Sequence, residues 1–193
     1  REYLKLRYLR QNLQLLRKQR SIRSAVVGLA TFWTIAQIIL IAMPDLVRQL
    51  PISASGVNGP GVLVYSCLGL VSGALLAGHI SRNHLEIGLI PFSALGIAVL
   101  LALAPSLETV PSLAAALVAT SFLAGLFVVP LNALIQFQAP PGQLGTISAG
   151  RNWFQAIGML IGLGLGAVAN MQGLDAAHLF YSLALVVAVG AGY

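Results

Sequence analysis

Six apolar stretches follow one another along the chain, with only short polar connections between them. The charge-poor windows fall near residues 24–43, 60–80, 87–104, 112–136, 150–170 and 176–193. A bilayer core about 30 Å thick is crossed by about 20 predominantly apolar residues in a helix. The connections contain turn residues, and none is long enough to form a domain. The sequence therefore predicts an all-α membrane protein with six transmembrane helices.

The composition supports this class. Of the 193 residues, 58 % are hydrophobic and only 8 % are charged, whereas roughly a quarter of the residues in an ordinary soluble domain are charged. A water-soluble globular domain is excluded on this ground. The single cysteine, Cys67, lies in an apolar run, so no disulfide framework is expected and a buried small hydrophobic role is predicted.

The basic residues indicate how the spans are threaded. With the N-terminus inside, the inside connections and the N-terminal tract hold all of the eleven Lys and Arg except Arg48. Such a bias is the positive-inside pattern of membrane proteins. Both ends of the segment are therefore predicted to be cytoplasmic.

Residues 1–23 form a separate predicted unit, ahead of a six-helix domain at residues 24–193. Eight of the eleven basic residues lie in this tract, and leucines recur on one face, at Leu6, Leu9, Leu13 and Leu16. This spacing predicts a basic amphipathic helix. It could lie along the inner membrane surface, or it could be a solvated linker between two halves of a larger protein, and the two interpretations are compatible.

Small residues recur every fourth position in the second and fifth windows, which allows helix backbones to approach closely. These helix-packing positions are Gly69, Gly73 and Ala77 in the second window and Gly158, Gly162 and Gly166 in the fifth. Two closely packing faces suggest that part of the surface they pack against is missing from this chain.

Polar side chains interrupt three of the windows. Uncompensated polar groups are costly in hydrocarbon, so these side chains must face protein or a wet cavity. They could simply hold helices together through hydrogen bonds, but their recurrence in three helices favours a polar substrate pathway. The candidates are Trp33, Thr34 and Gln37, then Asn132 and Gln136 behind Pro130, and then Arg151, Asn152 and Gln155.

The sequence lacks the motifs of an enzyme. It contains no acyltransferase His-x-x-x-x-Asp box, no phosphate-binding glycine loop, no nucleophile elbow and no metal-ligand cluster. His79 and His84 are predicted to lie at the membrane interface. No Asp or Glu falls inside a span, which argues against a proton relay through a buried carboxylate. We expect no catalytic residues, no metal, no cofactor and no nucleic-acid partner.

Several stretches carry a resemblance to a known family. Six spans behind a long basic tract resemble the C-terminal half, helices 7–12, of a major facilitator superfamily transporter. The stretches "GLATFWTI", "GALLAGHISRNHLEIGLIPFSALG", "VVPLNALIQFQAP" and "GTISAGRNWFQAIGML" are similar to the lysophospholipid transporter branch. That branch includes transporter segments fused to acyl-ACP synthetase and 2-acylglycerophosphoethanolamine acyltransferase modules.

The resemblance implies a mechanism and partners. Two halves would rock about a central site in a bacterial inner membrane, so an N-terminal six-helix half, membrane lipid and a lysophospholipid such as lysophosphatidylethanolamine are the expected partners. Asn132 and Gln136 would line the cavity between the halves, and the second and fifth helices would pack on the other half.

The superfamily's loop signature is degenerate in this sequence. Gly78 and His79 stand where an acidic residue and an arginine are expected, and Arg82 with Glu86 could supply a substitute gating pair.

Three functions remain open at the level of sequence. The first is lysophospholipid transport that supplies re-acylation. The second is transport of another amphipathic molecule, such as a drug or metabolite. The third is a membrane anchor for an attached acyltransferase or ligase, without transport of its own. Uptake of labelled lysolipid, compared with other amphiphiles, separates the first from the other two.

The threading can be tested by cysteine accessibility in intact cells. A cysteine introduced at Ser55 should react with an impermeant reagent added from outside, because residue 55 lies in a predicted outside connection. A cysteine at Asn83, in a predicted inside connection, should be protected. Labelling at position 83 with none at position 55 would contradict the predicted topology.

Overall fold

The structure, a computed structural model, describes residues 20–50, 59–82 and 86–191, and every regular element in these ranges is helical. The predicted basic helix within residues 1–19 lies outside the described residues. The elements are α2 (Arg20–Arg48), α3 (Gly59–Ile80), α4 (Leu89–Leu103), the 3-10 turn η2 (Ala104–Ser106), α5 (Val110–Gln138), α6 (Leu144–Met171) and α7 (Ala176–Ala191). Each predicted window corresponds to one of these helices, and the first helix begins before residue 24, at Arg20.

Four of the helices are long and apolar enough to cross a membrane, namely α2, α4 continued by η2, α5 and α6. By length and composition, these four helices agree with the expectation of membrane-spanning helices. The other two windows form shorter apolar helices, Val64–Ile80 within α3 and the 16-residue α7.

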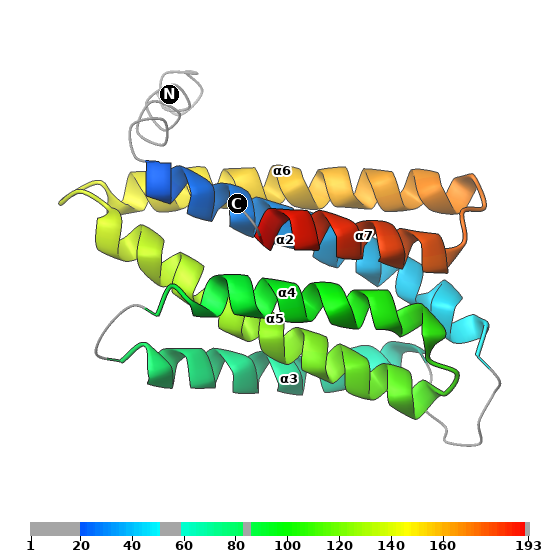
Figure 1. Cartoon of the computed structure of the whole chain (residues 1–193). Helices are drawn as coiled ribbons and strands as arrows, with labels where there is room; N and C mark the ends of the chain where they lie inside the picture. The colour runs from blue at the N-terminus through cyan, green and yellow to red at the C-terminus, as the bar shows by residue number, and fades with distance from the viewer. Residues whose placement is uncertain (1–19, 51–58, 83–85, 192–193) are drawn as a thin grey trace.

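Two helices occupy the centre of the bundle (Figure 1). α2 packs against α6, α5 and α7, and α5 packs against α3, α4 and α2. α4 and α7 pack against each other and cover one side. α3 and α6, the second and fifth helices, lie at opposite flanks, and each packs mainly against one central helix.

Interior contacts gather in two clusters of buried side chains. The larger one joins α2, α4, α5 and α7 and includes the fully buried Leu113 and Phe180. The smaller one joins the first turns of α2 to the end of α5 and the start of α6, around Leu29, Ile135 and Ile147. Burial of each large aliphatic or aromatic side chain contributes about 1.5–3 kcal/mol.

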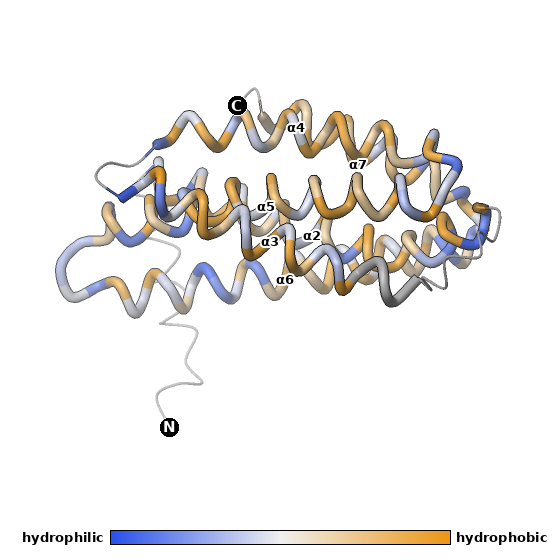
Figure 2. Tube along the Cα trace, turned by 90° about the horizontal axis from the view of Figure 1, so that it is seen from below, coloured by the Kyte–Doolittle hydropathy of each residue, from blue (hydrophilic) through white to orange (hydrophobic). Residues whose placement is uncertain are grey.

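Much of the outer surface is hydrocarbon. Leu75 on α3 is 70 % exposed and Leu160 on α6 is 68 % exposed, and apolar residues run along the length of the helices while hydrophilic ones gather towards the ends (Figure 2). Contiguous apolar surface of this extent is rare on soluble monomers and suits contact with lipid chains. Cys67 belongs to this exposed surface of α3, so the prediction that it is buried was wrong.

Glycines bring the flanking helices into backbone contact with the central ones. A Cβ built on Gly158 of α6 would lie 2.7 Å from the Ala30 carbonyl oxygen of α2, and one on Gly162 would collide with the Thr34 carbonyl oxygen. On the other flank, Cβ atoms built on Gly69 and Gly73 of α3 would collide with the carbonyl oxygens of Val118 and Phe122 in α5.

The glycine stripes are therefore covered inside this chain. A Cβ on Gly125 of α5 would lie 2.6 Å from the Leu70 carbonyl oxygen of α3, so the α3–α5 contact is close from both sides. A Cβ on Gly166 would meet the Ile41 side chain of α2 at 2.7 Å. These contacts account for the stripes, which corrects the expectation that the glycine faces require a surface missing from the chain.

Two glycines have positive φ angles in the connections that follow α5 and α6. Gly142 has a φ of +77°, and the Gln143 N–H donates to the Pro140 carbonyl at 3.0 Å, which closes a tight turn between α5 and α6. Gly173 has a φ of +67° behind α6, and the Leu174 N–H donates to the Ala169 carbonyl in the pattern of a Schellman cap. The chain reverses at both points, so that α6 runs antiparallel to α5 and α7 runs antiparallel to α6.

Charged residues separate to the two ends of the bundle. The basic end, where α2 and α6 begin, holds Arg20, Arg23, Arg82 and Arg151 together with Glu86. The acidic end, where α2 and α6 finish, holds Asp45, Glu108 and Asp175 together with Arg48.

The close α2–α6 contact predicts a position-dependent effect of adding one methyl group. Gly158→Ala should destabilise the protein by about 1–3 kcal/mol, because the new Cβ overpacks against the α2 backbone. Gly164→Ala on the same helix is the matched control, since no atom lies within 4 Å of its added Cβ. Thermal unfolding in detergent measures both; equal melting temperatures for the two variants would contradict the contact.

Candidate functional site

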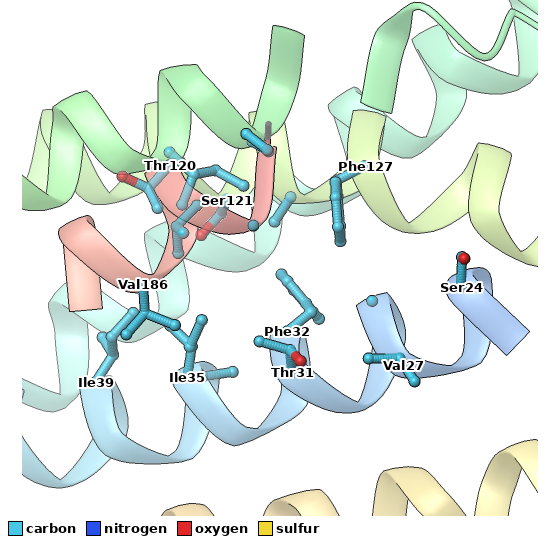
Figure 3. A pocket seen from close by; sticks show the side chains of 18 of the residues that line it. Ser24, Val27, Thr31, Phe32, Ile35, Ile39, Thr120, Ser121, Phe127 and Val186 are labelled. Atoms are coloured by element: carbon cyan, nitrogen blue, oxygen red, sulfur yellow. The ribbon is translucent and has the colours of Figure 1, made fainter. Parts of the chain in front are cut away.

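A groove of about 660 Å³ runs between the central helices, from the basic end towards the middle of the bundle (Figure 3). We call it the α2–α5 groove. Most of its walls come from α2 and α5, with contributions from α4, α7 and Ser66 of α3. Its volume is in the range of about 300–1,000 Å³ that is typical of small-molecule sites.

The walls of the groove are mostly hydrocarbon. Phe32 of α2 and Phe127 of α5 stand on opposite sides with their ring centroids 5.9 Å apart. Ile35 and Ile39 continue the α2 wall, and Val186 extends it on α7 (Figure 3). An apolar chain placed here would exchange contact with lipid for contact with these side chains.

The basic end of the groove carries positive charge. Arg20 and Arg23 line it where α2 begins, followed by Ser24 one turn further in. Both arginines are exposed, so their guanidinium groups can meet an anion at the surface. Arginine suits phosphate because its planar fork presents several N–H donors.

Hydroxyl groups mark the deeper part of the groove. Thr31, Thr120 and Ser121 line it together with Ser66. The Thr120 hydroxyl donates to the Ala116 carbonyl of its own helix at 2.8 Å, which satisfies the donor within an apolar wall. The groove is thus amphipathic along its length, with guanidinium groups at one end and hydrocarbon with a few hydroxyls beyond.

The arginines of this groove are not among the site residues predicted from the sequence. Arg20 and Arg23 both belong to the predicted basic tract, and the early start of α2 places them on the same helix as the first apolar window. A signal was present, because Arg20, Ser24, Val27, Thr31 and Ile35 recur at the helical spacing of one face.

The predicted polar residues of α5 and α6 form a separate cluster at the basic end. Arg151 Nη1 donates to Asn132 Oδ1 at 2.5 Å, and Arg151 Nη2 donates to Asn152 Oδ1 at 3.1 Å. Asn132 Nδ2 donates in turn to the Val128 carbonyl at 2.9 Å. The Asn132 amide therefore uses both its NH₂ group, which bonds within α5, and its oxygen, which joins α5 to α6.

Two predicted glutamines flank this cluster. Gln136 lies one turn beyond Asn132 and is exposed, while Gln155 lies one turn beyond Arg151 and is half-buried. The structure brings Asn132, Arg151 and Asn152 together by hydrogen bonds, and it places these glutamines beside them on the same two helices.

The predicted polar residues of α2 face away from the groove. Thr34 Oγ1 donates to the Ala30 carbonyl at 2.9 Å and would lie 2.8 Å from a Cβ on Gly158. Gln37 Cβ would lie 3.0 Å from a Cβ on Gly162. Both residues thus sit at the α6 contact, and Trp33 packs edge-on against Phe32 at 5.6 Å between ring centroids.

The loop candidates surround the connection between α3 and α4. Gly78 and His79 are exposed in the last turn of α3, and no atom lies within 4 Å of a Cβ built on Gly78. Arg82 is exposed and Glu86 is half-buried, on either side of residues 83–85. Those three residues, with His84 among them, lie outside the described part of the chain, and the substitute gating pair stays a prediction.

A second polar cluster links three helices at the acidic end. Asn170 Nδ2 of α6 donates to Asp45 Oδ2 of α2 at 2.8 Å, and Arg48 Nη1 contacts Asp45 Oδ1 at 3.3 Å. Gln49 Nε2, just beyond α2, donates to Asp175 Oδ1 at 3.2 Å in front of α7.

The Asp175 carboxylate is stabilised in its charged form. The Gln49 amide and the Ala177 backbone N–H both donate to it and hold the pKa of Asp175 below its usual value. In the described ranges no group of three His, Cys, Asp or Glu side chains is placed to hold a metal ion.

Comparison with protein-family models, with curated proteins and with solved structures found no match to this chain.

The geometry of Asn132 predicts a structural effect that Gln136 lacks. Asn132→Leu should lower the stability by about 1–3 kcal/mol, since it removes the acceptor of the Arg151 Nη1 group, a partly buried charged donor, and leaves only the bonds to Asn152. Gln136→Leu, one turn away on an exposed position, should change stability by less than about 0.5 kcal/mol.

Uptake of labelled lysolipid, the activity that the resemblance implies, separates this role from substrate contact when it is measured per folded molecule on the same preparations. We expect it to be unchanged in the folded fraction of the Asn132→Leu protein. Unaltered stability combined with lost transport would instead assign Asn132 to the substrate pathway.

Proposed function

We propose that this chain is one half of a major facilitator superfamily transporter that moves a lysophospholipid across the bacterial inner membrane for re-acylation. The observation that carries the proposal is the α2–α5 groove, which combines hydrocarbon walls with two arginines at one end. A lysophospholipid has the matching chemistry, because it joins one acyl chain to a phosphate-bearing head group.

The arrangement of the helices supports a half-transporter. Six antiparallel apolar helices form the bundle, and the second and fifth helices stand at its flanks with large exposed apolar faces. In the superfamily that the sequence resembles, the corresponding helices pack against the other half, and the two halves rock about a site near the bilayer midplane. The flanks of α3 and α6 are suitably placed for such contacts.

The charge distribution supports an orientation. Arg20, Arg23, Arg82 and Arg151 gather at the basic end, and an excess of Lys and Arg marks the cytoplasmic side of a membrane protein. The groove would then open towards the cytoplasm, where re-acylating enzymes, fused or separate, would receive the lysophospholipid.

Removing the charge at the mouth of the groove tests the proposal. Arg20→Gln combined with Arg23→Gln should reduce uptake of labelled lysophosphatidylethanolamine by vesicles about tenfold, because a hydrogen bond to a charged group contributes about 1.5–3 kcal/mol and 1.4 kcal/mol corresponds to a factor of ten. The six Lys and Arg in residues 1–19 remain to maintain the orientation.

Arg48→Gln is the matched control, since Arg48 is also an exposed arginine of α2 but lies at the acidic end. Vesicles with the Arg48→Gln protein should take up labelled lysophosphatidylethanolamine at nearly the rate of vesicles with the unchanged protein. Equal uptake by all three proteins would refute the head-group role of the arginines. No uptake by the unchanged protein, with an attached acyltransferase still active, would favour the membrane-anchor function, and faster uptake of an unrelated amphiphile would favour the second transporter function.

A further inference from the structure

The α2–α5 groove has a direction, which constrains how an amphiphile can occupy it. Its charged end lies at the first residues of α2, and its lining on that helix continues to Ile39 and Leu40. From Arg23 to Ile39 the helix rises about 24 Å at 1.5 Å per residue. One leaflet of a bilayer core is about 15 Å deep, so the groove is long enough for one acyl chain with its head group at the arginines.

The other helices place the deep end of the groove near the middle of the bundle. On α5 the lining runs from Thr120 to Phe127, within a helix that extends from Val110 to Gln138. On α7 the lining residues run from Val186 to Ala191, and Val186 lies beside Ile35 and Ile39 of α2 (Figure 3). The groove is thus longer than the depth of one leaflet core, and its deep part lies against the hydrophobic cluster that includes Ile35 and Ala124.

Small side chains open the deep end. Ala36 of α2, Ala94 of α4 and Ala124 of α5 line it from three directions. Ala94 and Ala124 are themselves buried, while Ala36 is half-buried. Larger residues at these positions would fill the space that a tail occupies, whereas the arginines would be unaffected because they lie about 15 Å or more away along α2.

We infer that the groove binds a single-chain phospholipid in the orientation of the cytoplasmic leaflet, with the phosphate at Arg20 and Arg23 and the tail end among Ala36, Ala94 and Ala124, which limit the length of the tail. This inference rests on the proposed function for the identity of the ligand. It assigns a binding site to this six-helix bundle alone, apart from the cavity between two halves.

The narrowness of the groove, rather than its charge, favours this ligand over an ordinary membrane phospholipid, because both lipids carry a phosphate group. A two-chain phospholipid would have to place a second chain beside Phe32 and Phe127, whose rings already face each other across the groove. The guanidinium pair at the mouth matches one phosphate group.

Photo-cross-linking tests the orientation without requiring transport. Two lysophosphatidylethanolamine probes of equal chain length carry a diazirine, one at the tail end and the other next to the glycerol. They are irradiated with the protein in native membrane vesicles, and the adducts are located by fragment mass spectrometry. The tail-end probe should label the region of Ile39, Ile97 and Thr120, and the glycerol-proximal probe should label Ser24 and Val27.

The opposite pattern would overturn the inference, and so would labelling confined to the outer face of α3 around Leu68 and Leu75, where any lipid can reach. Correct labelling in a protein that shows no transport would refute the proposed function and leave the binding site standing. Transport without groove labelling would refute the site and leave the function.

Filling the deep end tests the limit on tail length. Ala36→Leu and Ala124→Leu, on opposite walls, should each weaken competition by a long-chain lysophosphatidylethanolamine about tenfold, with little change for a short-chain one. Ala115→Leu is the matched control, because Ala115 is exposed on the same helix as Ala124. Unchanged binding of the short-chain lipid shows that each variant is folded, and an equal loss for both chain lengths would contradict the assigned tail site.

Discussion

Close backbone contact at glycine is the interaction on which this bundle depends. α6 approaches α2 at Gly158 and Gly162, and α3 approaches α5 at Gly69 and Gly73. In a membrane there is little hydrophobic gain from bringing two apolar helices together, so van der Waals contact between closely fitting surfaces has to hold them. The two glycine contacts attach each flanking helix to one central helix, and the remaining pair, α4 and α7, covers the larger cluster of buried side chains.

The groove exists because the central helices use different faces for different purposes. α2 presents Thr34 and Gln37 to α6 and presents Phe32 and Ile35 to the groove. The polar side chains of the face towards α6 are used in helix packing, and the face towards the groove forms an open hydrocarbon wall. Polarity inside a transmembrane segment therefore did not mark the cavity in this helix. The open end of the groove is marked instead by arginines at the start of the helix.

The sequence could predict the helices well and their partners poorly. Apolar windows locate the ends of each helix to within six residues, because length and hydropathy are local properties. The turn at Gly142 and the end of α6 at Gly173 follow from local chemistry. Which helix covers a glycine stripe is a long-range property, and the stripes were assigned to a missing partner although α2 and α5 cover them. The Asn132–Arg151 bond likewise joins residues from two helices, whose rotation about their axes no local pattern determines.

The pairing of helices has a mechanical consequence. Two helices whose backbones touch cannot slide or rotate against each other without a collision, and the Asn170–Asp45 bond fastens the α2–α6 pair at its acidic end as well. The α3–α5 pair is fixed in the same manner along Gly69, Gly73 and Gly125. Each pair therefore forms a rigid unit, and the α2–α5 groove lies between the two units. Under the proposed function, a lipid tail that entered the groove would push the two helix pairs apart, and the thickness of the tail would set the angle between them.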